Sequence, residues 1–157
     1  GKNVPERVES IVSGETSQPG VTRITIVILG DELMVNQIAA QCRKLIPVMV
    51  VKILDEETSI QREFAMIKVK AVDRNARDEV IQMANIFRAN IIDVGRDTLT
   101  VAIFGDRSKT RALTDLLADF GILEIAKTGT LAIERGRSTI YDDNKIKEEY
   151  NYGKNVL

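Results

Sequence analysis

The sequence contains no histidine and no tryptophan among its 157 residues. Histidine is the side chain most often used for proton transfer near neutral pH, so its absence weakens an enzyme interpretation, although carboxylates, lysine and tyrosine remain. There is no phosphate-binding glycine loop, no cluster of metal ligands and no candidate catalytic triad in the sequence. A small stand-alone enzyme is therefore disfavoured, and no catalytic or metal-binding residue is expected.

Cysteine is equally scarce, because Cys42 is the only one. A single cysteine excludes an intrachain disulfide framework and fits a reducing compartment. Basic and acidic residues number 22 and 23, so no global field would attract nucleic acid or an anionic membrane. The sequence also has no run long and apolar enough to span a membrane, and no apolar signal-peptide centre at its start. We therefore expect a soluble chain with neither nucleic acid nor a membrane as partner.

What the chain does contain is one pattern that occurs twice. "TIVILGD" at residues 25–31 and "TVAIFGD" at residues 100–106 share their β-branched, apolar, glycine and aspartate positions. A helix pattern and a strand pattern follow each of them. The repeat indicates one small fold built twice, in which each Gly-Asp pair turns the chain out of a strand and caps the next helix.

The first copy has the order β-β-α-β. "VESIVSGE" (8–15) and "VTRITIVILG" (21–30) predict a hairpin, and "VMVVKIL" (48–54) predicts a buried strand. Between them, apolar residues at helical spacing predict one helix face, formed by Met34, Ile38, Cys42 and Leu45. The polar segment 55–63 then has no packing period and is the best candidate linker.

The second copy predicts the full order β-α-β-β-α-β. A final strand interrupted near Thr128-Gly129 closes it, and Arg88 and Asp93 are placed to form a structural ion pair across one helix-strand connection. The fold class is α+β, with two ferredoxin-like domains, of which the second packs two helices on one face of an antiparallel sheet. The predicted limits are a first domain at 1–54 that lacks its opening β-α unit, a linker at 55–63, a second domain at 64–136 and a polar tail at 137–157.

These segments carry a resemblance to a known family. "VESIVSGETSQPGVTRITIVILGD" and "CRKLIPVMVVKI" are similar to the N-terminal ACT domain of the small regulatory subunit of acetolactate synthase, and "QREFAMIKVKA", "IFRANIIDV" and "AKTGTLAIERG" are similar to its C-terminal domain. The motifs occur in the right order over residues 8–136. The usual opening strand, turn and helix of the family are not represented in this sequence.

The resemblance implies a non-catalytic subunit in branched-chain amino acid biosynthesis. Such a subunit binds and activates a large catalytic subunit, confers feedback inhibition by valine or a related amino acid, and forms a homodimer through its ACT domains. The chain itself is expected to bind no cofactor, whereas its catalytic partner would hold thiamine diphosphate, Mg and FAD. The expected compartment is the cytoplasm of a bacterium or archaeon, or a plastid or mitochondrion in a eukaryote.

Two groups of site residues follow from this resemblance. Effector binding is expected near the start of the first domain, at Asn3, Arg7, Val8, Glu9 and Ser10, where the alternative is ordinary solvent-facing strand residues. Contact with the catalytic subunit is expected at Gln61, Arg62 and Glu63, where the alternative is a solvated linker.

A different class of function also fits the order β-α-β-β-α-β. RNA-recognition domains share it, and the chain could be an RNA-binding or other ferredoxin-like interaction module. Base stacking requires exposed aromatic residues on the two central strands. "FAMIKVKAV" and "TVAIFGD" offer one phenylalanine each, and aromatic residues make up only 4% of the chain, so this alternative ranks second.

Overall fold

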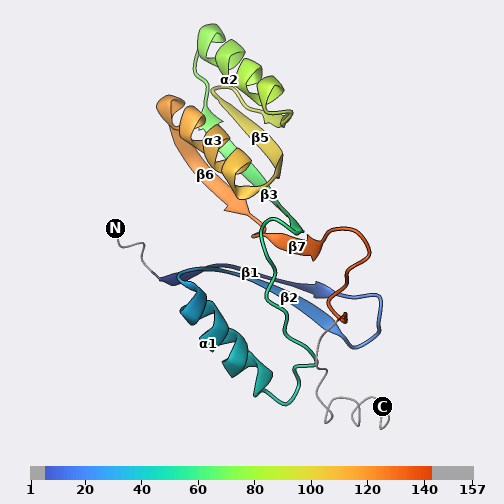
Figure 1. Cartoon of the computed structure of the whole chain (residues 1–157). Coiled ribbons are helices and arrows are strands. Elements are labelled where there is room, and N and C mark those ends of the chain that lie inside the picture. Colours follow the sequence, from blue (N-terminus) through green and yellow to red (C-terminus); the bar gives the residue numbers. More distant parts are fainter. Residues whose placement is uncertain (1–5, 143–157) are drawn as a thin grey trace. The chain divides into compact units, whose positions relative to one another are not determined.

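The computed structural model describes residues 6–142, and Figure 1 shows its strands and helices. In chain order these are β1 (Arg7–Glu15), β2 (Thr22–Leu29), α1 (Glu32–Arg43), β3 (Ser59–Lys70), α2 (Arg74–Ile86), β4 (Asn90–Val94), β5 (Thr98–Gly105), α3 (Arg107–Leu117), a short 3-10 helix (Ala118–Phe120), β6 (Ile122–Lys127) and β7 (Leu131–Glu134). None of the helices within these residues is long and apolar enough to cross a membrane.

The strands form two sheets. β1 and β2 make a two-stranded sheet, and the second sheet has the order β4-β5-β3-β6, with β7 also paired to β3. β3 runs antiparallel to both of its neighbours, β5 and β6. From β3 to β6 the chain therefore follows the predicted β-α-β-β-α-β order, and the α+β fold class is confirmed.

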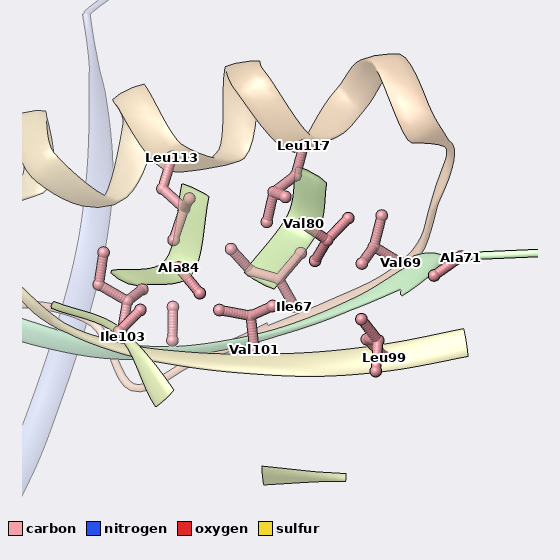
Figure 2. Packing of buried hydrophobic residues seen from close by; sticks show 12 residues of the cluster. Ile67, Val69, Ala71, Val80, Ala84, Leu99, Val101, Ile103, Leu113 and Leu117 are labelled. Atoms are coloured by element: carbon pink, nitrogen blue, oxygen red, sulfur yellow. The ribbon is translucent and has the colours of Figure 1, made fainter. Parts of the chain in front are cut away.

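The main core lies between this second sheet and its two helices. Every second residue of β3 from Ala65 to Val69 is fully buried, as Val101 is on β5. Figure 2 shows Leu113 and Leu117 reaching from α3 toward this layer, with Val80 and Ala84 contributed by α2. Because both helices cover the same face of the sheet (Figure 1), the side chains that alternate with the buried ones point to the opposite, open face.

The two Gly-Asp corners are built alike. Asp31 caps α1, since its Oδ1 accepts a hydrogen bond from the backbone N–H of Met34 at 2.8 Å. Asp106 caps α3 in the same way, accepting from the backbone N–H of Lys109 at 2.9 Å. The prediction that each Gly-Asp pair ends a strand and caps a helix is confirmed.

Three local expectations are corrected. The segment 48–54 is not a strand, because β1 and β2 pair only with each other and no described segment supplies the ladder hydrogen bonds that 48–54 would need. Leu45 lies beyond the end of α1 and is 56% exposed, so the helix face ends at Cys42. Residues 59–63, expected in the linker, form the start of β3, where Ser59 and Glu63 are buried.

The expected ion pair between Arg88 and Asp93 is absent from the described residues. Arg88 has a φ of 55°, a left-handed conformation that ends α2, whereas Asp93 lies on β4 beside a register shift. In the described residues, the connection from α2 to β4 is therefore made by a left-handed turn, with no ion pair between Arg88 and Asp93 across it.

Within the described residues the chain divides into two compact units. One comprises residues 6–11, 26–60 and 132–142, and the other comprises residues 12–25 and 61–131. The first contains the ion pair between Lys52 Nζ and Glu134 Oε1, at 2.6 Å. The second contains the main hydrophobic core.

Candidate functional site

The first candidate site is the start of β1, where the effector was expected. Arg7 and Glu9 lie two residues apart on the strand, and Arg7 Nη2 is 3.1 Å from Glu9 Oε2. Val8 and Ser10 alternate with them, and Val8 is half exposed. Asn3 lies outside the described residues. The structure therefore brings one cation and one anion together, which are the two groups that a zwitterionic amino acid would require.

The second candidate site is the trio Gln61, Arg62 and Glu63 on β3. Alternation along the strand separates their side chains: Glu63 lies on the face covered by the helices and is 7% exposed, whereas Arg62 is exposed on the open face. Arg62 Nη1 donates to the carbonyl of Gln61 at 2.8 Å. Of the two charged members of the trio, Arg62 is thus the one that a macromolecular partner can reach.

Arg62 also acts on the neighbouring helix cap. The pKa of Asp106 is lowered from its ordinary value of 3.8, first by the hydrogen bond from the backbone N–H of Lys109, next by the hydroxyl of Ser108 and more weakly by the positive charge of Arg62. Ser108 Oγ donates to Asp106 Oδ1 at 2.8 Å. Asp106 is therefore held as an anion at the corner where β5 meets α3.

The open face of the second sheet is a feature that the sequence reasoning missed. Phe64 and Phe104 are directly paired across β3 and β5, and they are 38% and 62% exposed. Met66 follows on the same face and is 39% exposed. In "FAMIKVK", Phe64 and Met66 alternate with the core residues, but from the sequence the two phenylalanines are considered only for base stacking.

Other functional chemistry is sparse in the described part of the chain. Residues 6–142 contain no group of three or more Cys, Asp or Glu side chains placed to hold a metal ion. Cys42 is a free, half-buried thiol on α1. The candidate sites are therefore charged or apolar surfaces suited to binding.

Comparison with known protein families identifies one match. Residues 62–136 match the family model described as the small subunit of acetolactate synthase. This region covers β3 from Arg62 onward and extends through β7. It thus includes the complete β-α-β-β-α-β order and the open face.

Individual relatives extend the similarity beyond that region. A probable acetolactate synthase small subunit from Methanothermobacter thermautotrophicus is 44% identical over 133 residues, which cover 85% of this chain and 79% of the relative. The acetolactate synthase small subunit of Aquifex aeolicus is 40% identical over 144 residues, 92% of this chain and 71% of that one. The crystal structure of the small subunit from Thermotoga maritima superposes with a TM-score of 0.75 at 37% identity, and the match covers 85% of this chain and 83% of that one.

Proposed function

The chain belongs to the family of acetolactate synthase small subunits, and we propose that it binds the catalytic subunit of that enzyme, raises its activity and makes it sensitive to valine or a related branched-chain amino acid. The observation that carries this proposal is similarity over most of the chain to proteins named as small subunits. A similar fold alone would not be enough, because ferredoxin-like domains serve many functions.

The division of labour follows from the residues present. The chain has no histidine, and its described part holds no metal-ligand group. We therefore assign the chemistry to the catalytic partner, which would supply thiamine diphosphate, Mg and FAD. The role of this chain is then to bind that partner and to respond to an effector.

Effector binding is proposed at the start of β1. An amino acid brings a carboxylate and an ammonium group, and Arg7 and Glu9 offer the opposite charge for each. In the free chain these two side chains neutralise each other at 3.1 Å, and the ligand would replace that contact with two new ones. Val8 and Ser10, together with Asn3, complete the proposed site, and two such chains would pair through their ACT domains.

Contact with the catalytic subunit is proposed at the beginning of β3. Arg62 is exposed there, and its guanidinium can form bidentate hydrogen bonds to a carboxylate of a partner. Gln61 lies beside it on the strand, while the buried Glu63 would act by fixing the strand's position. Arg62→Ala should therefore weaken binding of the catalytic subunit, and Lys127→Ala, which removes an exposed charge from β6, is a matched control.

The proposed function is tested by reconstitution. Mixing this chain with the catalytic acetolactate synthase subunit from the same source should raise its turnover, and adding valine should then lower it. If turnover does not change at saturating amounts of this chain, the proposal is wrong.

The effector site is tested on the chain alone. Valine should raise the melting temperature, because a ligand that binds only the folded state stabilises it by mass action. Glu9→Gln should reduce the shift, whereas Glu124→Gln, which neutralises an exposed acid on β6, should leave it unchanged. An equal shift in both variants would place the effector elsewhere.

A further inference from the structure

The first turns of α3 carry a run of basic side chains. Arg107, Lys109 and Arg111 occupy every second position, and Arg107 and Arg111 lie on one helix face because they are four residues apart. Arg111 is exposed, and the other two are partly exposed. The helix has no acidic residue in its first turn and no basic residue in its last turn. Its basic side chains are therefore arranged against the helix dipole, which favours anions at the N-terminus.

Helix stability does not explain this basic start. α1 shows the favourable arrangement, with Glu32 in its first turn and Arg43 in its last turn. α2 also begins with basic residues, but Arg77 there has a structural role, since its guanidinium donates to backbone carbonyls of the turn between β4 and β5. In α3, Arg107 and Arg111 also repel each other as like charges one turn apart. A local preference that is violated in this way is typical of a functional surface.

Arg62 lies beside the start of α3. β3 and β5 are antiparallel, and their register pairs Glu63 with Gly105, so Arg62 comes next to the Asp106 cap from which the helix starts. The positive charge of Arg62 contributes to the lowered pKa of Asp106. β6 lies on the other side of β3 from β5, so Lys127 is outside this region. The end of β3 and the start of α3 thus form one basic corner, which consists of Arg62, Arg107, Lys109 and Arg111.

The acidic groups near the basic corner leave its exposed guanidinium groups without an ion pair. Asp106 is engaged as the helix cap, and Glu63 is buried on the face covered by the helices. Asp115 follows Arg111 by four residues on α3. In the described part of the chain, neither Arg62 nor Arg111 forms an ion pair with an acidic side chain, Asp115 included. Both can therefore form bidentate hydrogen bonds with carboxylates of another molecule.

We propose that the basic corner binds an acidic surface of the catalytic subunit. This inference rests on the proposed function, and it extends the contact from Arg62 on β3 to the first turns of α3. Opposite charges of this kind accelerate association and select the correct partner. The formal net charge of the chain is −1, so no wider basic field surrounds the corner for a nucleic acid to follow.

Charge reversal tests the contact with the full chain and the catalytic subunit from the same source. Arg111→Glu should weaken their binding by about tenfold or more at low salt, and Arg111→Lys should weaken it much less. Arg74→Glu is the matched control, because Arg74 is an exposed arginine at the start of α2, which follows the other end of β3. Both reversals place an anion near a helix N-terminus, so circular dichroism should show that both variants fold.

Salt dependence separates an electrostatic contact from a structural effect. Raising the salt concentration should weaken binding of the wild type more than binding of Arg111→Ala, since the variant has one ion pair fewer to screen. Equal binding by Arg111→Glu and Arg74→Glu, with the wild type still bound and active, would overturn the inference alone. It would also be overturned if Arg111→Glu lost retention on single-stranded RNA but kept its affinity for the catalytic subunit. Absence of binding by the wild type would contradict the proposed function itself, and this contact with it.

Discussion

At the scale of single residues, Asp106 shows how one side chain fixes a corner of the fold. It accepts hydrogen bonds from the backbone N–H of Lys109 and from the hydroxyl of Ser108. Asp106→Ala should lower the free energy of unfolding by about 1 kcal/mol, the usual contribution of a helix N-cap. Asp106→Asn should cost less, because asparagine caps helices nearly as well.

The same residue gives stability a pH dependence of known sign. Because the folded-state pKa of Asp106 is lowered, its contribution is present above the unfolded pKa and is lost as pH falls through the folded pKa. The difference in unfolding free energy between wild type and Asp106→Asn should therefore be constant near neutral pH and shrink as the pH falls below the ordinary pKa of 3.8. Urea denaturation at several pH values measures it, and a constant difference would contradict the assignment.

Arg88 has a left-handed backbone conformation, which is unfavourable for a residue that carries a Cβ atom. It follows the last turn of α2 with φ of 55°, its N–H bonds to the carbonyl of Asn85, and the N–H of Ala89 bonds to that of Ala84 at 2.8 Å. This is a Schellman motif, whose left-handed position is usually glycine. Arg88→Gly should raise the free energy of unfolding by about 0.5 to 1 kcal/mol.

Arg88→Ala provides the control, since alanine keeps the Cβ atom that makes the left-handed conformation unfavourable. Thermal or urea denaturation should show a gain for glycine alone. Equal stability of the two variants would mean that the Cβ atom is not the cause. The sequence did not reveal this turn, because the residue that usually marks it is missing.

At the scale of elements, the junction between β6 and β7 depends on one hydroxyl. Thr128 Oγ1 accepts from the backbone N–H of Phe64 at 3.1 Å and lies 2.8 Å from the carbonyl of Gly129, to which it donates. Gly129 itself has φ of 90°. The predicted interruption of the last strand near Thr128-Gly129 is confirmed, and at that point the Thr128 hydroxyl takes the place of a backbone acceptor for the N–H of Phe64.

Removing that hydroxyl should destabilise the centre of β3, where the backbone N–H of Phe64 would lose its acceptor. Thr128→Val keeps the volume but removes the acceptor, so unfolding free energy should fall by about 1 kcal/mol. Amide exchange at Phe64 should become faster in the same variant. Thr128→Ser should preserve both quantities, and unchanged exchange in Thr128→Val would show that the hydroxyl does not support the strand.

The elements differ in how far the sequence could specify them. The helix caps at Asp31 and Asp106 and the strand from Phe64 onward were predictable, because capping and alternation are local signals. The segment 48–54 was not, since an apolar run becomes a strand only when a neighbouring strand is available to bond with it. The same limit applies to Phe104, whose exposure depends on which face of the sheet the helices cover.

At the scale of the whole molecule, the two copies of the repeat have unequal cores. From β3 to β6, six apolar residues other than alanine have 0% exposure: Ile67, Val69, Val80, Val101, Leu113 and Leu117. In the described residues before β3, the buried apolar side chains are Ala39 and Met49. The sequence indicated the repeat from matching strand-helix corners, but local similarity of that kind does not report how much core each copy builds.

This inequality predicts a large difference in local stability along the chain. Amide protons of β3 and β5 should exchange most slowly, and those of β1, β2 and α1 should exchange much faster, because exchange follows local opening that buried packing opposes. Limited proteolysis should cut first at residues 55–58, a turn that precedes β3, and leave a resistant fragment that begins near Ser59. Mass spectrometry of exchange and of the digest measures both. Equal protection before and after residue 59 would show that the first copy is as stable as the second. Binding of an effector at Arg7 and Glu9 should slow amide exchange in β1, β2 and α1 and so reduce the difference in exchange rate between the two copies.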